Sequence, residues 1–173
     1  MIEISCIVLS NLNDLFVKNR TIPSIIENSK SHSIEIIVVD NSPNQDFECD
    51  DVKVIYSEPY HIPKAYNKGV SKAQGKYVAL FHDDCELNDE KWIEKSLKEL
   101  NENVWMVGPE LNIGLNVENG KKMYFLKEVP LIMEKDNFIF IGSYDETYFI
   151  GAEDFNLSKI VQELGKDIKK VDI

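Results

Sequence analysis

Two pairs of adjacent acidic residues are the part of this sequence best suited to chemistry. Asp83–Asp84 follow an apolar run, and Glu153–Asp154 open the last amphipathic stretch of the chain, about seventy positions later. Adjacent carboxylates repel each other, and a divalent cation bound through oxygen ligands offsets that repulsion. A carboxylate at a helix N-terminus is stabilised in its ionised form, as a general base at neutral pH must be. The pairs therefore predict a metal site and a base. A solvated turn and a helix cap are the alternatives.

Further polar residues follow the predicted strands directly. Asp40 and Asn41 come after the apolar run 34–39, and His82 comes after the run 77–81. Because ligands of open α/β sheets bind outside the carboxyl ends of the strands, these side chains are expected at the same edge as Asp83. Asp40 by itself could equally be a turn former.

The elements that position these residues alternate between strand and helix. The runs 4–9 and 34–39 are short, apolar and rich in β-branched residues, which is typical of parallel strands covered on both faces. Further strands are predicted at 52–56, 77–81 and 104–107. The predicted helices cover 15–26, capped from within 11–14 and with Pro23 as a break or restart, and 63–73, ended by Gln74–Gly75.

The second half of the chain is less regular. Asp89 is predicted to cap a helix whose apolar stripe is Trp92, Ile93, Leu97 and Leu100, with Trp92 in the core. Residues 111–141 indicate an antiparallel or irregular section with turns at Asn119–Gly120, Val129–Pro130 and Asp136–Asn137. A last helix is predicted with a buried stripe of Leu157, Ile160, Val161 and Leu164, and Gly165 as its stop. The whole chain, 1–173, is expected to be a single α/β domain.

Composition excludes several classes of protein. A net charge of -11 and a pI near 4.7 argue against binding to nucleic acid or to an anionic membrane, and a bound phosphate would need a metal ion. Three cysteines without CxxC or Cys/His spacing support neither a disulfide framework nor a zinc site. No apolar run approaches the roughly 20 residues of a transmembrane helix, and no basic signal-peptide start is visible. A cytoplasmic protein is expected.

Four blocks of the sequence, in order and in register, resemble the signature blocks of family 2 glycosyltransferases with the GT-A fold. They are 36–42, 65–77, 80–87 and 142–157. The resemblance implies a Rossmann-like, mainly parallel sheet flanked by helices. It also implies an inverting transferase that uses a nucleotide-diphosphate sugar and Mg²⁺ or Mn²⁺. A nucleotide-binding half would span about 1–108 and an acceptor half about 109–173.

The resemblance also assigns roles to single residues. Asp40 would meet the nucleobase, Asp83 and Asp84 would hold the ribose, diphosphate and metal, and Glu153–Asp154 would meet the acceptor, with Asp154 as the base. The remaining donor-site residues are Ser10, Asn11, Asn67 and His82. The family usually has aspartate at the position of His82, so one metal or ribose contact is expected to differ.

Several alternatives stay open at this point. A UDP-sugar is the expected donor and a glycan or a lipid-linked molecule the expected acceptor, and a homodimer, a partner subunit or peripheral placement at the inner face of the membrane are all compatible with the sequence. His82 and the early end at Ile173 also suit a catalytically inactive or partner-dependent remnant of the fold that binds a nucleotide or sugar. A nucleotidyltransferase would show a glycine- and Arg/Lys-rich loop after the first strand, and the segment 10–13 is not one.

Overall fold

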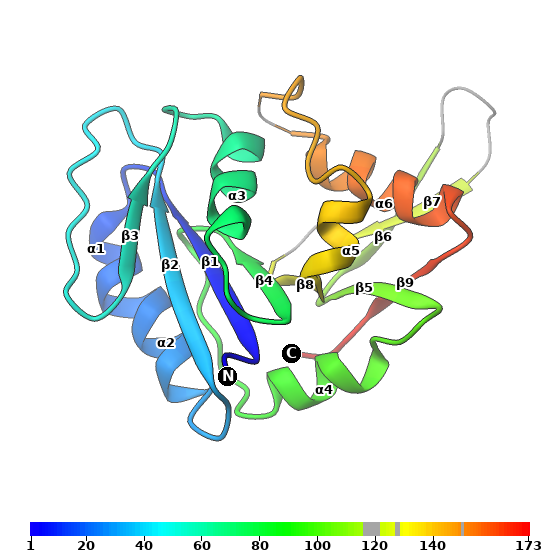
Figure 1. Cartoon of the computed structure of the whole chain (residues 1–173), viewed down its shortest axis with the longest axis horizontal. Helices are drawn as coiled ribbons and strands as arrows, with labels where there is room; N and C mark the ends of the chain where they lie inside the picture. Colours follow the sequence, from blue (N-terminus) through cyan, green and yellow to red (C-terminus); the bar gives the residue numbers. More distant parts are fainter. Residues whose placement is uncertain (116–121, 127–128, 150) are drawn as a thin grey trace.

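A seven-stranded sheet in the order β3-β2-β1-β4-β8-β5-β9 forms the centre of the computed structural model, which describes residues 1–115, 122–126, 129–149 and 151–173 (Figure 1). Its strands are β1 Ile4–Ser10, β2 Ile34–Asp40, β3 Lys53–Tyr56, β4 Tyr77–Phe81, β5 Val104–Gly108, β8 Leu131–Glu134 and β9 Asp167–Lys170. β1 pairs in parallel with β2 and β4, and β2 pairs in parallel with β3, as the apolar runs predict. β8 is antiparallel to both of its neighbours, β4 and β5, and supplies the antiparallel section expected within 111–141.

Helices cover both faces of this sheet. They are α1 Asp14–Phe16, continued by a π-helical turn Val17–Thr21 and by α2 Ile22–Glu27, then α3 Ile62–Ser71, α4 Trp92–Glu99, α5 Lys135–Phe140 and α6 Glu153–Glu163. The core on one face joins the α1–α2 segment and α4, and the core on the other face joins α3, α5 and α6. The apolar residues of β1 divide between the two cores, with Ile4, Cys6 and Val8 in one and Ile7 and Leu9 in the other, and every residue of β1 is buried. This explains why β1 reads as an unbroken apolar run.

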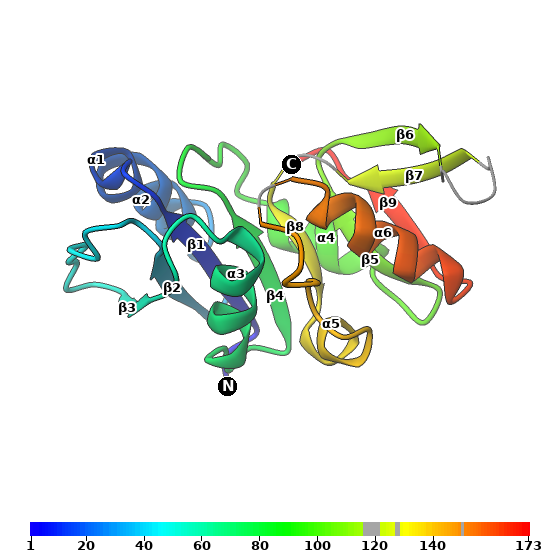
Figure 2. The ribbon, with the colours of Figure 1, turned by 90° about the horizontal axis from the view of Figure 1, so that it is seen from above.

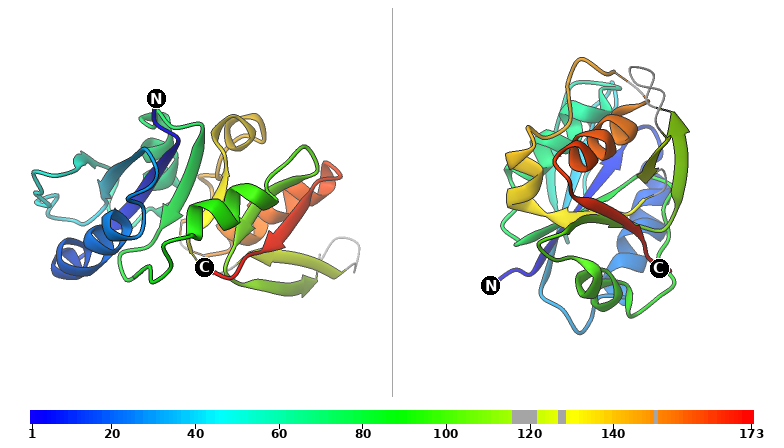
Figure 3. Two further views of the ribbon diagram at one scale, coloured as in Figure 1. Left: turned by 90° about the horizontal axis from the view of Figure 1, so that it is seen from below. Right: turned by 90° about the vertical axis from the view of Figure 1, so that its right-hand side faces the viewer.

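The strands β6 Leu111–Leu115 and β7 Lys122–Leu126 form a separate antiparallel hairpin. Viewed from above, the hairpin lies at the end of the molecule opposite α1 (Figure 2). In the end-on view it stands beside α6 and β9 (Figure 3, right). The turn expected at Asn119–Gly120 lies outside the described residues.

Some local predictions are wrong. The helix before β4 ends at Ser71, and Gly75 does not act as its left-handed stop: its backbone lies against Ser5, where an added Cβ would be 2.7 Å from the Ser5 nitrogen. Asp136–Asn137 lie inside α5 and not in a turn. The predicted buried stripe of α6 is limited to Leu157 and Val161, because Ile160 is only half-buried and Leu164, 46% exposed, lies after the last helical residue. The predicted cap at Asp89 is also wrong, because the N-cap residue of α4 is Lys91 and no side chain among the described residues caps the helix; Asp89 accepts the backbone N–H of Lys91 through Oδ1 in the turn before the helix.

Other local predictions are confirmed. Pro23 occupies the first turn of α2, where its missing N–H costs no hydrogen bond. Gly165 has φ +72° directly after α6, as a helix stop requires. Trp92 is fully buried, and its indole N–H donates to Ser29 Oγ at 3.1 Å.

Candidate active site

The carboxyl ends of the parallel strands bring the predicted polar residues side by side. Ser10 of β1 is paired with Asp40 of β2, and Val8 is paired with Phe81 of β4. The residues after Phe81 therefore continue beside the end of β1. The segment 142–149, which precedes α6, lies at the same upper edge of the sheet in Figure 1. One edge of the molecule thus collects residues that are far apart in the sequence.

The acidic loop after β4 is fixed through its backbone. The side chains of Asn13 and Thr21 donate to the Asp83 carbonyl at 3.3 and 3.4 Å. Asn13 is at the N-cap position of α1 but makes no capping hydrogen bond with its side chain. The helix that begins after β1 therefore positions the acidic loop.

The carboxylates of this loop suit a divalent cation. Asp83 is half-buried and Asp84 is exposed. Burial, and then the charge of Asp84, raise the pKa of Asp83, although a hydrogen bond from the Asn11 backbone opposes this. No cluster of three or more metal-ligating side chains exists among the described residues. Mg²⁺ commonly takes only one or two carboxylates together with substrate phosphates, so the pair present fits such an ion. A cavity of about 440 Å³ opens beside Asp84 and His82.

The polar groups of two predicted donor-site residues, Ser10 and Asp40, form hydrogen bonds within the protein. The Ser10 hydroxyl donates to Asp14 Oδ1 at 2.6 Å. Asp40 is fully buried, and its two carboxylate oxygens accept the backbone N–H groups of Ser42 and Phe47 at 2.8 and 3.0 Å. Asp40 therefore organises the loop after β2, in line with the alternative that it is a turn former. Its contact with a nucleobase stays a prediction.

Two asparagine side chains at this edge have polar atoms without a partner. Asn41 is 0% exposed, and neither its Oδ1 nor its Nδ2 forms a hydrogen bond with any described residue. The buried Oδ1 of Asn11 is also unpaired within the described part of the chain. An unsatisfied buried amide costs about 1–3 kcal/mol, so these groups are suited to meet a ligand or bound water.

Asn67 joins the two halves of the chain. Its amide donates to the Tyr144 carbonyl at 2.9 Å and to Glu146 Oε1 at 3.0 Å, and its Oδ1 accepts the Tyr144 N–H at 3.0 Å. The side chain predicted to touch the donor therefore holds the segment before α6 against α3.

The second acidic pair stands in the first turn of α6. Ala152 precedes the pair with φ +66°, and Asp154 accepts the Phe155 N–H through Oδ1 at 2.7 Å. Burial raises the pKa of Asp154, and the neighbouring Glu153 adds to the rise; backbone hydrogen bonds only partly oppose it. Desolvation thus outweighs the helix N-terminus that was expected to favour the charged form. Glu153 is 9% exposed, and its Oε2 has no partner among the described residues.

One histidine and one tyrosine lie close enough to both acidic pairs to interact with them electrostatically. His82 interacts electrostatically with both Asp83 and Asp154 and lowers the pKa of each. Its ring stacks on Tyr66 of α3, with centroids 6.2 Å apart. Tyr66 is buried, its hydroxyl has no partner within the described residues, and Glu153 and Asp83 are among the groups that raise its pKa.

Sequence reasoning missed Tyr66 and its neighbour Tyr144 as site residues. Burial raises the pKa of both phenols, and the two rings lie 5.7 Å apart. Both residues stand within the blocks 65–77 and 142–157, which could have drawn attention to them. Their meeting depends on the packing of α3 against the segment before α6, and neither block records that packing.

The fold is the GT-A fold. The structure resembles that described as "Crystal structure of GalNAc-T7 with UDP, GalNAc and Mn2+", with a TM-score of 0.79, 13% identity and coverage of 99% of this chain. It also resembles the mannosyltransferase PcManGT from Pyrobaculum calidifontis in complex with GDP-Man and Mn²⁺, with a TM-score of 0.69, 12% identity and coverage of 97%. This chain spans 43% and 54% of the lengths of those two proteins.

The sequence matches the family described as glycosyl transferase family 2 over residues 18–122, which is more than half of the chain. The chain belongs to that family. A comparison with curated protein sequences gives no match. Within the described residues, no helix is both long enough and apolar enough to cross a membrane.

Proposed function

We propose that this chain is a metal-dependent inverting glycosyltransferase. It moves a sugar from a nucleotide-diphosphate sugar to a hydroxyl group of a glycan or a lipid-linked acceptor. Family membership supports the reaction class. The observation that carries the proposal is the packing around Tyr66 of α3, whose ring stacks on His82 beside the first acidic pair at 6.2 Å and lies 5.7 Å from Tyr144 in the segment before α6. This packing supports a candidate metal ligand and a candidate base on the same edge of the molecule.

The reaction is a single displacement. Asp154 accepts the proton of the acceptor hydroxyl while that oxygen attacks the anomeric carbon. The bond from this carbon to the diphosphate oxygen breaks on the opposite face, and the nucleoside diphosphate departs with the electron pair. One displacement inverts the anomeric configuration. Asp83 and Asp84 would hold a divalent cation, which supplies neutralisation of the charge on the departing diphosphate.

A UDP-sugar is the proposed donor. The two similar structures hold UDP and GDP-Man, each with Mn²⁺, which supports a nucleotide-diphosphate donor with a metal but not one base over the other. The unpaired Oδ1 of Asn11 and the unpaired amide of Asn41 stand after β1 and β2, next to the place where the nucleotide would bind. An asparagine can donate and accept hydrogen bonds at once, as contact with a base or ribose requires.

The test separates donor binding from transfer. Asp154→Asn keeps the size of the side chain and removes its ability to accept the proton, so we expect unchanged donor affinity and a loss of transfer of about 100-fold or more. Isothermal titration with UDP and Mn²⁺ measures the first, and product formation from a radiolabelled donor measures the second. Transfer that survives in Asp154→Asn would remove Asp154 as the base. If the wild-type chain bound the donor but neither transferred nor hydrolysed it, the alternative of a catalytically inactive, nucleotide-binding remnant of the fold would be favoured.

A further inference from the structure

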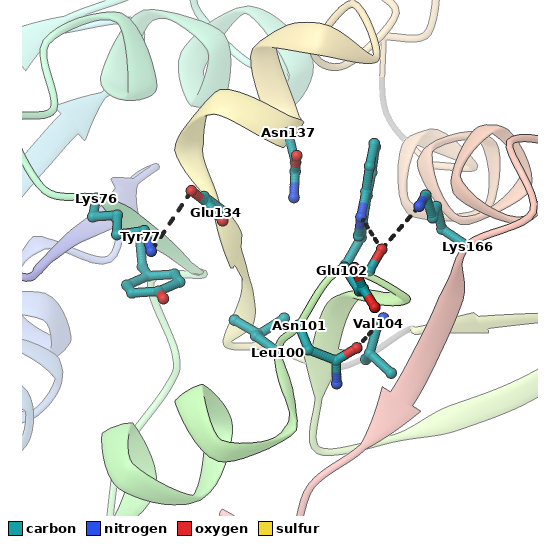
Figure 4. Close-up of a pocket in the computed structure, with 10 residues that line it drawn as sticks. Lys76, Tyr77, Leu100, Asn101, Glu102, Val104, Glu134, Asn137 and Lys166 are labelled. Atoms are coloured by element: carbon teal, nitrogen blue, oxygen red, sulfur yellow. Dashed lines mark hydrogen bonds and ion pairs between the residues drawn. The ribbon is translucent and has the colours of Figure 1, made fainter.

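A second cavity of about 510 Å³ opens at the opposite edge of the sheet (Figure 4). It lies between the amino ends of β4 and β5, the end of β8 and the first turn of α5. Tyr77 lines it at the start of β4, whereas the acidic loop follows Phe81 at the other end of that strand. At about 3.3 Å per residue, the two ends of the strand are roughly 13 Å apart. A small ligand in this cavity would not touch the candidate active site.

The charges that line the cavity are balanced. Lys76 faces Glu134 at 3.8 Å, and Lys166 donates to the Glu102 carbonyl at 2.8 Å. Both lysines therefore already have acceptors, and two glutamate side chains line the same space. A phosphate or another anion needs an excess of positive charge, which this cavity does not offer. A neutral polar ligand fits it better.

The aromatic wall of the cavity is held in place. The indole N–H of Trp105 donates to the Glu102 carbonyl at 3.1 Å, and Lys166 Nζ lies 5.1 Å from the centre of the ring. Phe140 packs against the indole at 6.0 Å with an angle of 78° between the planes. Lys76 Nζ lies 4.9 Å from the centre of the Tyr77 ring, so a lysine covers part of each ring. Trp105 and Tyr77 are nevertheless only half-buried, which leaves part of each side chain open to a ligand. Rings fixed in this way contribute contact area with little loss of conformational entropy.

Two polar side chains of the wall have unused hydrogen-bonding capacity. Neither the Asn137 amide nor the Glu102 carboxylate forms a side-chain hydrogen bond or ion pair with another described residue. Asn137 points from α5 into the space between Glu134 and Glu102 (Figure 4). An amide with two donors and one acceptor, beside a carboxylate that only accepts, can bind neighbouring hydroxyl groups.

We infer that this cavity binds a neutral saccharide unit, as a second site remote from the transfer reaction. The apolar C–H face of a pyranose ring would lie on the aromatic wall, and its hydroxyl groups would meet Asn137 and Glu102. The inference goes beyond the proposed function, because it depends on the chemistry of this cavity and not on any step of transfer. A free sugar and one unit of a longer glycan share this chemistry.

Tryptophan fluorescence tests the site, because one of the two tryptophans of the chain, Trp105, lines the cavity. The other, Trp92, is 0% exposed in the core and should not respond to a ligand there. The probes are glucose, galactose, mannose and N-acetylglucosamine, together with maltotriose and chitotriose. We expect a saturable change in emission with at least one probe, and no such change in Trp105→Phe. Tighter binding of a trisaccharide than of its monosaccharide assigns the cavity to a glycan chain. Equal binding assigns it to a single sugar unit.

Asn137→Ala provides the decisive comparison. It removes an amide without a partner among the described residues, so the fold should survive while the dissociation constant rises about five- to tenfold. Asn19→Ala, an exposed asparagine on the π-helical turn, is the matched control and should leave the constant unchanged.

Three results would overturn the inference. They are no saturable change with any saccharide, binding that Asn137→Ala does not weaken, and competition by inorganic phosphate, which would mark an anion site. Asp84→Ala keeps the two proposals separate. It should abolish metal-dependent nucleotide binding and leave saccharide binding intact, so failure of either proposal is recognisable without the other.

Discussion

Burial affects the pKa values of Asp83 and Asp154 in the candidate site more than any nearby helix end does. Asp154 is in the first turn of α6, where free backbone N–H groups favour a negative charge, yet its pKa is raised because the side chain is desolvated and stands next to Glu153. The pKa of Asp83 is also raised, first by burial and then by the charge of the adjacent Asp84. A base with a raised pKa holds a proton more strongly, which suits it to accept one from a sugar hydroxyl.

The pH dependence of transfer follows from Asp154. In the proposed mechanism the ionised form of Asp154 is the base, so kcat/KM should fall as the pH is lowered through the pKa of Asp154 in the folded protein. Because that pKa is raised, the acid limb should lie above the value of about 3.9 for an unperturbed aspartate. A pH–rate profile at saturating Mn²⁺ checks this. A limb at the unperturbed value, or the same limb in the residual activity of Asp154→Asn, would contradict the assignment.

The ionised Asp83 side chain should lower the free energy of unfolding at neutral pH. A folded-state pKa above the unfolded value means that stability is lost as the pH rises through the folded pKa, so the charged carboxylate destabilises the fold at pH 7. Asp83→Asn should therefore raise Tm at pH 7 in the absence of a metal ion, because it removes a carboxylate whose charged form is disfavoured by burial and by Asp84.

Thermal unfolding as a function of pH tests this sign. The gain from Asp83→Asn should shrink as the pH is lowered, because the wild-type carboxylate then becomes neutral. Asp51→Asn is the control, since Asp51 is exposed and should show no gain. A loss of stability in Asp83→Asn at pH 7 would show that the carboxylate is stabilising, contrary to its raised pKa.

Among the elements, α3 does most to assemble the site. It begins at His61, whose Nδ1 accepts the Lys64 N–H, and it carries Tyr66 and Asn67 to the segment before α6. Two helices that are distant in the sequence are thereby joined at the active edge. The exit from α3 matters as well, because the chain must turn tightly past β1 to enter β4.

Gly75 allows that close passage. A methyl group there would lie 2.7 Å from the Ser5 nitrogen and 2.9 Å from the Ile4 carbonyl carbon, both of them backbone atoms that cannot easily move. Gly75→Ala should therefore destabilise the fold by about 2–3 kcal/mol, as overpacking does. Gly165→Ala is the control: its added Cβ meets no heavy atom within 4 Å, and only the cost of φ +72°, about 1 kcal/mol, applies.

Chemical denaturation of both glycine variants measures the difference. If Gly75→Ala cost no more than Gly165→Ala, Gly75 would be an ordinary helix stop, as the sequence alone suggested. Secondary structure by circular dichroism should be unchanged in both variants, so that the comparison reports packing and not a new fold.

At the scale of the molecule, the acidic charge should determine how a nucleotide binds. With a net charge of -11, the protein repels a free diphosphate unless a cation accompanies it. UDP with Mn²⁺ at 100 times its Kd should stabilise the folded state by about 2.7 kcal/mol, which corresponds to a rise in Tm of roughly 5–11 °C. UDP without metal should produce little change.

Differential scanning fluorimetry with UDP, GDP, CDP and dTDP, each with and without Mn²⁺, makes this measurement. The nucleotide with the largest metal-dependent shift identifies the donor class. Asp84→Ala should lose the metal-dependent part of the shift without lowering the Tm of the unliganded protein, because it removes a charge that disfavours the ionised Asp83. Equal shifts with and without Mn²⁺ would argue against a metal-dependent donor site, and no shift with any nucleotide would argue against the donor site itself.

Much of this architecture follows from the sequence, because parallel strands covered on both faces must be apolar throughout. The runs at 4–9, 34–39 and 77–81 therefore mark the central strands, and the acids that follow 77–81 stand at their carboxyl edge. Short helices carry weaker signals. Asp136–Asn137 has the composition of a turn, yet packing of Phe138 into the core makes that segment helical.

What the sequence determined by itself was the family, the order of the central strands along the chain and the acidic pairs. Only the tertiary structure decided which polar groups remain available. The Asp40 carboxylate is hydrogen-bonded within its own loop, and the Asn67 amide is hydrogen-bonded to the segment before α6. The Tyr66 hydroxyl and the Asn41 amide, in contrast, have no hydrogen-bond partner in the described structure. Burial and hydrogen-bond partners come from residues distant in the sequence, so local pattern cannot reveal them. For the same reason, only the folded chain shows the second cavity.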